Sequence, residues 1–446
     1  MNTQSLDHPI DKLVYEAVFG DTSQKQAARF SIWQQAIEAK VIPASINDFY
    51  LAKATGKVPK DLTVPAMNIR GMSYDVARAA FQAAKEHQVG ALVFEIARSE
   101  IGYTDQRPEE YTIVMMAAAL REGWSGPLFI QGDHFQAKAT GPGVPKEGEI
   151  KTIKDLIAEA IKAGFYNIDI DMSTLVDLDK SSEDEQQQAN IKYSLEMANF
   201  IRDLEPKGAT VSLGGEIGHI GGKNSTLEDL RAYMSGFNAG LASGVVGMSK
   251  ISIQTGTHHG GVVLADGSLA DISVDFSILK DVSQVGRDEY RIGGAVQHGA
   301  STLPDKFFNQ FTQSEAVEVH LATGFQNIQF DHESFPKDLL NKMYAWLDET
   351  KQDERGSDQT AEQFHYKLRK KAWGEFKQAT WDIPEVDKAK IRQSLRERFA
   401  FFYQQLNVVN TAELINELVK PVVPEKTKAD FVRGQVKADD VKGLAD

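Results

Sequence analysis

Short β-type runs alternate with amphipathic helical runs along most of this 446-residue chain, from residue 62 onward. This alternation is typical of βαβ units, which build a parallel sheet. We predict strands at residues 62–70, 90–98, 127–134, 166–173, 210–218, 250–260, 290–301 and 327–331. We predict helices between them at residues 74–88, 109–122, 150–163, 184–204, 227–242 and 305–323. Eight such units favour a (β/α)8 TIM barrel, and an open doubly wound sheet is the alternative architecture.

Helical patterns flank the barrel pattern on both sides. Residues 1–61 carry apolar residues at three- and four-residue spacing, which is typical of amphipathic helices. Residues 350–446 contain further helical runs and end in a polar tail. We therefore divide the chain into an N-terminal helical extension (1–61), the barrel (62–349) and a helical C-terminal extension (350–446).

The charge and composition narrow the range of partners. With 42% apolar and 25% charged residues, the chain has the composition of a soluble globular protein. Its net charge of −14 disfavours nucleic acid and anionic membranes as partners, because both would repel it. The absence of cysteine excludes thiolate metal sites, so a transition metal would need histidine and carboxylate ligands. Because neither a leader peptide nor a long apolar run is present, we expect a cytoplasmic protein that binds a small molecule.

Histidine and acidic residues gather at the predicted carboxyl ends of the strands. Six of the ten histidines lie there: His134, His219, His258, His259, His298 and His332. Asp133, Asp171 and Glu216 occupy the ends of the third, fourth and fifth strands. A barrel brings the carboxyl ends of its strands to one face, so we expect these side chains to converge. Three imidazoles would bind a metal with one position open, and such a metal can polarise a carbonyl and hold an enediolate.

Small residues follow two of these strand ends. Gly260 follows His259, and Gly299 and Ser301 follow His298. Glycine lets backbone N–H groups approach an anion closely, and barrels often bind phosphate after strands seven and eight. The pattern therefore fits a phosphate site, and ordinary turns are the alternative.

Six motifs, in the same order along residues 62–332, resemble those of the zinc-dependent class II fructose- and tagatose-bisphosphate aldolase superfamily. Pro65-Ala-Met-Asn68 is similar to Pro-Ala-Phe-Asn, Asp133-His134 to Asp-His, and Ile170-Asp171-Met-Ser173 to Ile-Asp-Gly-Ser. Glu216-Ile-Gly218-His-Ile-Gly221-Gly222 resembles Glu-Leu-Gly-x-x-Gly-Gly, Gly256-Thr-His-His259-Gly260 resembles Gly-Thr-x-His-Gly, and His298-Gly-Ala-Ser301 resembles His-Gly-Gly-Ser. The resemblance implies a barrel enzyme of the aldehyde-lyase class.

The resemblance also implies roles for individual residues. His134, His259 and His298 would bind one catalytic Zn²⁺, with Glu216 and Asp171 at an inner metal position or orienting the ligands. Asp133 would be the acid/base that moves the C4 hydroxyl proton. Substrate or phosphate contacts fall on Asn68, Gly260, Gly299, Ser301, Gln329, Asp331 and His332. A monovalent cation is a further candidate ligand.

The reaction implied by this resemblance is aldol cleavage and condensation of a ketose phosphate through a zinc-bound enediolate, as in glycolysis and related carbohydrate metabolism. The resemblance implies an assembly of at least two subunits, for which the terminal helices could form the interface. A monomer is the alternative.

Several departures from the family pattern leave other functions open. Lys223-Asn224 replaces the acid that follows Gly-Gly in the strand-five loop, although His219 lies in the same loop. The strand-eight pattern Asn-x-Asp/Asn-Thr-Asp becomes Gln329-Phe-Asp331-His332-Glu333, and Ala97-Arg98 replaces a strand-two Ser-Asn. The alternatives are a metal-dependent epimerase of a ketose or sugar acid, and a non-catalytic subunit of an aldolase complex. A lysine Schiff-base aldolase is disfavoured because no β-type run ends in lysine.

Overall fold

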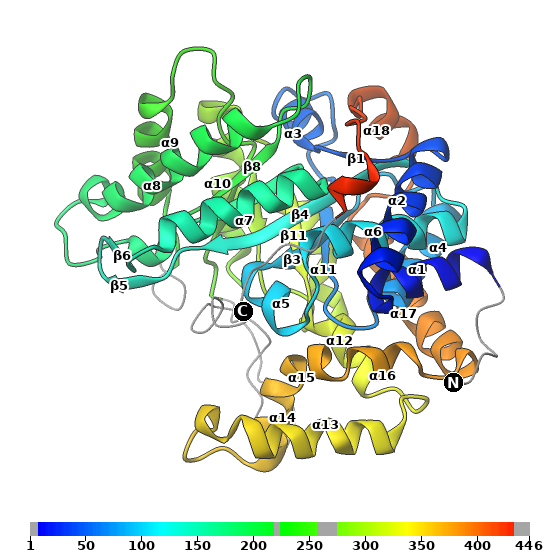
Figure 1. Cartoon of the computed structure of the whole chain (residues 1–446). Helices are drawn as coiled ribbons and strands as arrows, with labels where there is room; N and C mark the ends of the chain where they lie inside the picture. The colour runs from blue at the N-terminus through cyan, green and yellow to red at the C-terminus, as the bar shows by residue number, and fades with distance from the viewer. Residues whose placement is uncertain (1–7, 218–223, 257–273, 432–446) are drawn as a thin grey trace.

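The computed structural model describes residues 8–217, 224–256 and 274–431, and within them eight parallel strands close into a barrel (Figure 1). The strands are β2 (Val64–Asn68), β3 (Val93–Ala97), β4 (Gly126–Gln136), β7 (Asn167–Asp171), β8 (Ser212–Glu216), β9 (Lys250–Ile253), β10 (Ala295–Gln297) and β11 (Glu318–Leu321). Closure is complete because β11 pairs in parallel with β2, while β4 pairs with β7. The predicted (β/α)8 barrel is confirmed, and the open-sheet alternative is wrong.

Helices surround this barrel as the outer layer. They are α4 (Ser73–Glu86), α6 (Pro108–Glu122), α7 (Glu149–Ala163), α8 (Glu183–Leu204), α9 (Leu227–Gly240), α10 (Phe276–Tyr290) and α11 (Phe308–Gln313). Gly123 and Gly164 end α6 and α7 with φ angles of 62° and 105°, the left-handed conformation that glycine commonly adopts at helix ends. Shorter elements follow β3 and β4: α5 (Arg98–Tyr103) and a small hairpin of β5 (Ala139–Gly141) and β6 (Val144–Pro145).

The position predicted for the eighth strand was wrong. Residues 327–331 belong to α12 (Thr323–Phe330) and its end, whereas the strand β11 lies in the predicted helix 305–323. The cause is the polar character of β11, in which Glu318 and His320 alternate with Val319 and Leu321. A barrel interior is usually filled by branched apolar side chains, so a half-polar run does not read as a barrel strand. Here Glu318 and His320 are both buried.

The N-terminal segment covers one side of the barrel. Helices α1 (Pro9–Phe19) and α2 (Thr22–Glu38) pack against α6. The segment was expected to be helical throughout, but β1 (Val41–Ala44) pairs in parallel with the first residues of β4, ahead of α3 (Asn47–Ala54). The short run Val41-Ile-Pro-Ala is too brief to distinguish from a helical stretch by periodicity alone.

Helices of the C-terminal segment pack directly on the barrel. Helix α17 (Glu385–Gln405) lies against α4, α11 and α12, where it takes the place of an outer barrel helix. Tyr403 on α17 is buried, and its hydroxyl donates to the carbonyl of Ala80 at 3.2 Å. Helices α13 (Lys337–Thr350), α14 (Ala361–Leu368), α15 (Ala372–Glu375) and α16 (Lys377–Trp381) form a group facing the carboxyl ends of the strands, and α18 (Ala412–Leu418) follows α17 (Figure 1). The division into three segments stays a prediction.

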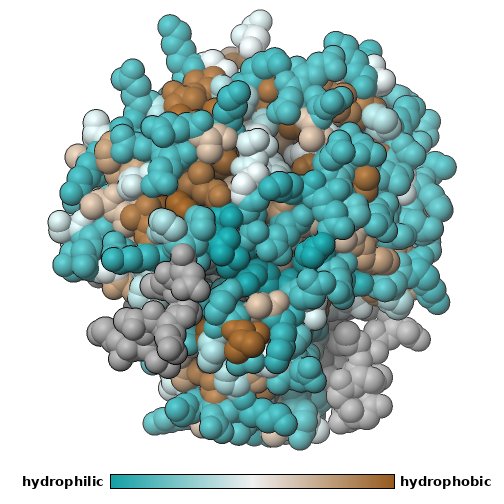
Figure 2. Space-filling view, turned by 90° about the vertical axis from the view of Figure 1, so that its right-hand side faces the viewer, coloured by the Kyte–Doolittle hydropathy of each residue, from teal (hydrophilic) through white to brown (hydrophobic). Residues whose placement is uncertain are grey.

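The surface in Figure 2 is mostly hydrophilic, with hydrophobic side chains in small groups between charged ones. The exposed large hydrophobic residues of the described chain are Val144, Leu178, Leu204, Val246, Val386 and Val423. They come from elements far apart in the sequence. Among the described residues, no helix is long and apolar enough to span a membrane. Assembly into an oligomer stays a prediction.

Candidate active site

Strand β4 delivers two adjacent side chains to one cavity. In a regular strand, neighbouring side chains point to opposite faces of the sheet. The pairing of β4 with β7 shifts register between Gly132 and Phe135, and His134 has a φ angle of 41°. This bulge turns both Asp133 and His134 toward the cavity lining. Gly132 is required there, because a Cβ atom would lie 2.5 Å from the ring of Phe135.

His134 is the centre of a buried cluster of possible metal ligands. Its Nδ1 atom lies 3.0 Å from a carboxylate oxygen of Glu216 and 3.1 Å from one of Asp171. Its Nε2 atom faces Nδ1 of His298 at 3.0 Å, and the other ring nitrogen of His298 contacts the Ser252 hydroxyl at 2.9 Å. These ligands come from β4, β7, β8 and the end of β10.

The donor set of this cluster fits a divalent metal. One ligand atom each from His134, Glu216 and His298 can be chosen so that all lie within 4.8 Å of one another. Two imidazoles and a carboxylate are ligands that zinc and related transition metals accept. Asp171 also accepts hydrogen bonds from Gln136 at 2.7 Å and from the Ser173 hydroxyl at 2.6 Å, so its position is fixed from several sides.

The protonation of the cluster reflects its burial and its concentration of acids. Burial and the Asp171 carboxylate raise the pKa of Glu216 to about 7. Although burial opposes it, the Asp133 and Glu216 carboxylates raise the pKa of His134 well above its ordinary value. Although burial also opposes it, hydrogen bonds from His134 and Ser173 lower the pKa of Asp171. The metal-free cluster therefore holds a protonated imidazole among carboxylates, and a dication would replace that charge.

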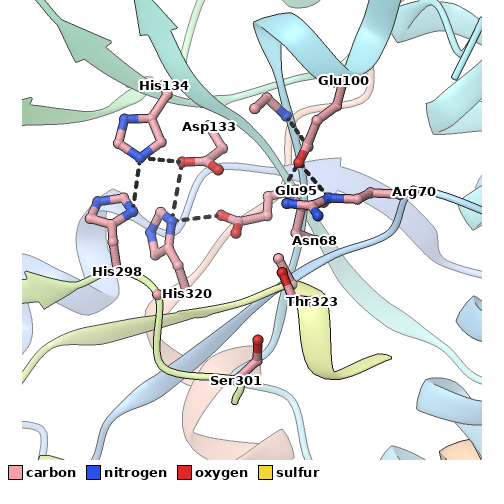
Figure 3. Close-up of a pocket in the computed structure, with 13 residues that line it drawn as sticks. Asn68, Arg70, Glu95, Glu100, Asp133, His134, His298, Ser301, His320 and Thr323 are labelled. Carbon is pink, nitrogen blue, oxygen red and sulfur yellow. Dashed lines mark hydrogen bonds and ion pairs between the residues drawn. The ribbon is translucent and has the colours of Figure 1, made fainter. Parts of the chain in front are cut away.

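A second buried group lies beside Asp133 and was missed by the sequence analysis. The Nδ1 atom of His320 lies 3.1 Å from Asp133 and 3.2 Å from Glu95, and its Nε2 atom lies 2.6 Å from Glu318 (Figure 3). Below it, Lys250 contacts Glu318 at 2.5 Å and Asp169 at 2.9 Å. The only signal in the sequence was that charged residues interrupt otherwise apolar strands.

Lys250 is a structural cation in this network. Although burial opposes it, Asp169 and Glu318 raise the pKa of Lys250 above its ordinary value. Its ammonium group also donates a hydrogen bond to the amide oxygen of Gln131 at 2.7 Å. A protonated, fully paired lysine is not a nucleophile, so Lys250 is unsuited to form a Schiff base with the substrate.

Polar groups line the side of the cavity opposite the histidines (Figure 3). Glu100 fixes two of them: it accepts hydrogen bonds from Nε of Arg70 and from the amide nitrogen of Asn68, both at 2.6 Å. Ser301 and Thr323 lie along the lower edge, where the Gly324 N–H donates to the Ser301 hydroxyl oxygen at 3.0 Å. The full lining is Asn68, Arg70, Glu95, Ala97, Glu100, Asp133, His134, His298, Gly299, Ser301, His320, Ala322 and Thr323.

Most of the predicted site residues within the described chain lie in or beside this cavity. Asn68, Asp133, His134, His298, Gly299 and Ser301 line it, and Asp171 and Glu216 contact His134. Gly299 has a φ angle of 69°, the left-handed conformation that glycine adopts without strain. The predicted ligand His259 and the predicted anion contact Gly260 lie outside the described residues, as do His219, His258 and Lys223.

Three predicted substrate contacts lie elsewhere, because the strand that was to carry them is a helix. Asp331 forms an ion pair with Arg369 of the C-terminal segment. The amide nitrogen of Gln329 donates to the Phe325 carbonyl within α12 at 3.2 Å. His332 lies 3.3 Å from the Ser394 hydroxyl on α17. None of the three belongs to the described cavity lining.

Residues 53–378 match the family model described as fructose-bisphosphate aldolase class-II. The chain belongs to this family. With strand eight at β11, the class II pattern Asn-x-Asp/Asn-Thr-Asp falls better on His320-Leu-Ala-Thr323-Gly324. In this placement His320 replaces the class II asparagine and Thr323 keeps the threonine, and both line the cavity.

Solved structures similar to this class II chain include proteins with other names. A fructuronate-tagaturonate epimerase from Cohnella laeviribosi is 11% identical, with 86% of each chain covered and a TM-score of 0.59. A probable tagatose 6 phosphate kinase from Sinorhizobium meliloti 1021 is 14% identical over 78% of this chain and 100% of that chain, with a TM-score of 0.55. Fructose-bisphosphate aldolase from Campylobacter jejuni is 16% identical over 83% of this chain and 98% of that chain, with a TM-score of 0.49. No curated protein sequence matches the chain. At these identities, the first two likenesses show a shared barrel fold.

Proposed function

We propose that this protein is a metal-dependent aldolase that cleaves and forms the C3–C4 bond of a phosphorylated ketose. The observation that supports the proposal is one cavity with three kinds of group. A cluster fitted to a divalent metal lies on one side, the Asp133 carboxylate lies next to it, and the hydroxyl side chains of Ser301 and Thr323 lie along the lower edge. Aldol cleavage needs these three functions: an electrophile, a base and an anchor for the substrate.

His134, Glu216 and His298 would hold the metal, with Zn²⁺ the ion that the family resemblance implies. When bound, the metal supplies a Lewis acid that polarises the ketose carbonyl. Asp171 accepts from His134 and from Ser173, so its role is to orient the imidazole. Ser252 has the same role for His298 through its hydroxyl.

Asp133 is the proposed base of the cleavage step. It takes the proton of the C4 hydroxyl, the C4 carbonyl forms, and the electron pair of the C3–C4 bond passes to the ketone half as an enediolate. In condensation the same carboxyl returns the proton. Asp133 is buried and held by His320 at 3.1 Å, so it is positioned before the substrate arrives.

The anionic end of the substrate has a proposed place at the lower edge of the cavity. Ser301 and Thr323 line this edge, and Thr323 is the first residue of α12, where helix N–H groups favour an anion. Arg70 is the only guanidinium among the described lining residues, and Glu100 holds it on the far side of the cavity. A phosphate or a carboxylate on the ketose would suit these donors.

A metal-dependent epimerase of a ketose or sugar acid is the second candidate. It is favoured by the remodelled substrate side of the cavity, where His320 and Glu95 add a second acid–base group beside Asp133. The fructuronate-tagaturonate epimerase from Cohnella laeviribosi shares the fold and has this reaction in its name. The two candidates differ in products, because an epimerase releases no triose.

The test is deuterium exchange into dihydroxyacetone phosphate in heavy water, followed by NMR, with Zn²⁺-loaded and chelated protein. We expect exchange only in the loaded protein, because enolisation of the ketone half needs the Lewis acid. His298→Ala is the control, and it should behave like chelated protein. Absence of exchange in loaded native protein would refute the aldolase proposal. Conversion of tagaturonate to fructuronate without triose would then support the epimerase.

A further inference from the structure

We propose that Glu95 is a second proton-transfer residue of this site and that it moves the C3 proton of the ketone half. This inference rests on the proposed aldolase function. Glu95 lies in β3 and lines the cavity, with its carboxylate beside His320 (Figure 3). It is fully buried, and its Oε1 atom has no hydrogen-bond partner among the described residues. A buried carboxylate oxygen without a partner points to a ligand that completes it.

The other oxygen of Glu95 is fixed in place. Its Oε2 atom accepts a hydrogen bond from the Gln131 amide at 2.9 Å and faces Nδ1 of His320 at 3.2 Å. The same His320 nitrogen lies 3.1 Å from Asp133. Two carboxylates therefore share one N–H group, and this link places Glu95 and Asp133 against the same cavity. Burial and the Asp133 carboxylate raise the pKa of Glu95 well above its ordinary value, which favours the protonated form that a proton donor needs.

The reaction needs such a group. Asp133 moves the hydroxyl proton, and a different acid must protonate C3 of the enediolate. In the family resemblance this acid follows Gly-Gly in the strand-five loop, but the sequence here has Lys223-Asn224. Glu95 would donate its proton to C3: the electron pair of the enediolate forms the C–H bond, the ketone returns, and Glu95 is left as carboxylate. The reverse step enolises the ketone.

Metal binding by Glu95 is the competing role, because Glu95, Glu318 and His320 are also close enough to share an ion. The Oε1 atom of Glu318 already contacts Lys250 at 2.5 Å, His320 at 2.6 Å and Gln131 at 3.0 Å. Lys250 therefore supplies the positive charge that an ion would bring. This arrangement favours proton transfer as the role of Glu95.

The test separates the two proton transfers with Glu95→Gln, which keeps the shape of the side chain. Exchange into dihydroxyacetone phosphate should fall at least about 100-fold, the usual size of general acid–base catalysis. Single-turnover release of glyceraldehyde 3-phosphate from fructose 1,6-bisphosphate should persist, because Asp133 remains. Asp133→Asn should lose that release. A general structural defect would not divide the two steps.

Two controls accompany this experiment. The zinc content and thermal midpoint of Glu95→Gln should match those of native protein. Glu122→Gln removes a carboxylate that pairs with Arg78 outside the barrel, and it should leave both steps unchanged. Native-like exchange in Glu95→Gln, or loss of its zinc, would overturn the assignment of Glu95 alone. Absence of exchange in loaded native protein would overturn the proposed function and this assignment together.

Discussion

Metal binding at the His134–Glu216–His298 cluster should release protons, and the number released should fall between pH 6 and pH 8. Glu216 has a pKa of about 7, so it is about nine-tenths protonated at pH 6 and about one-tenth at pH 8. A metal ligand must be deprotonated, so this carboxyl contributes about 0.8 fewer protons at the higher pH. Although burial opposes it, the Asp133 and Glu216 carboxylates raise the pKa of His134, so this imidazole is a second source of released protons.

The measurement is calorimetric titration of chelated protein with Zn²⁺ or Mn²⁺ in buffers of different ionisation enthalpy. The dependence of the observed heat on the buffer gives the protons released per metal. Glu216→Gln removes the titrating carboxyl, so it should lose the pH-dependent part of the proton release and also bind the metal more weakly, because Glu216 is a proposed ligand. Equal release by native protein at pH 6 and pH 8 would refute the reasoning, as would an unchanged difference in Glu216→Gln.

The same carboxyl should make the metal-free protein less stable as pH rises. The pKa of Glu216 is raised from 4.5 to about 7, so the folded state binds this proton more tightly than the unfolded state. Its stabilising contribution is complete below about pH 4.5 and is lost as pH rises through about 7, with a size of about 3 kcal/mol. Urea unfolding of chelated native protein and Glu216→Gln across this range should show a flatter dependence for the variant. Parallel curves would contradict this expectation.

Five substitutions test three separate parts of the structure. His298→Ala should lose tight metal binding, whereas Ser252→Ala, which removes only the hydroxyl at 2.9 Å, should weaken it about 10- to 100-fold in a competition assay with a chelating dye. Lys250→Met leaves two buried carboxylates without their cation, so it should lower the free energy of unfolding by about 3–5 kcal/mol. Lys151 has a side chain that is 78% exposed, so Lys151→Met should change the free energy of unfolding by less than about 1 kcal/mol. Equal effects of the two substitutions would contradict the buried network. Asp331→Asn breaks the ion pair with Arg369, so it should lower the free energy of unfolding by at most about 1 kcal/mol and leave KM unchanged. A raised KM would support the substrate contact that the sequence predicted for Asp331.

Much of the fold could be predicted from the sequence because most helices and strands have a recognisable local pattern. The first five strands and most outer helices were predicted within a few residues of their observed bounds, and glycine ends two of the helices. The predicted sixth and seventh runs contain β9 and β10 but are several residues longer than these strands. The eighth strand failed because its interior residues are Glu318 and His320. Their burial is tolerated because Lys250 neutralises the carboxylate, and Lys250 lies 68 residues before Glu318. No local window of sequence contains that partner.

The residues of the candidate site were likewise predicted only in part. The order of motifs brought attention to Asp133, His134, Asp171, Glu216 and His298, which the structure places together. Glu95 and His320 carried no comparable signal, because a charged residue inside a strand is usually read as exposed. The contacts predicted for Gln329, Asp331 and His332 were inferred from the expected end of strand eight, and the structure places these residues at the end of α12, outside the described cavity lining.

Residue type and spacing alone establish the eightfold alternation, the absence of thiolate ligands, and the histidines and acids at successive strand ends. Which of these side chains face one cavity depends instead on how distant strands pair. The bulge in β4 turns Asp133 and His134 to the same side, and closure of β11 on β2 brings His320 between Asp133 and Glu95. The bulge and the closure both depend on pairing between distant strands. The buried carboxylates are tolerated because imidazoles and Lys250 lie beside them and compensate their charge.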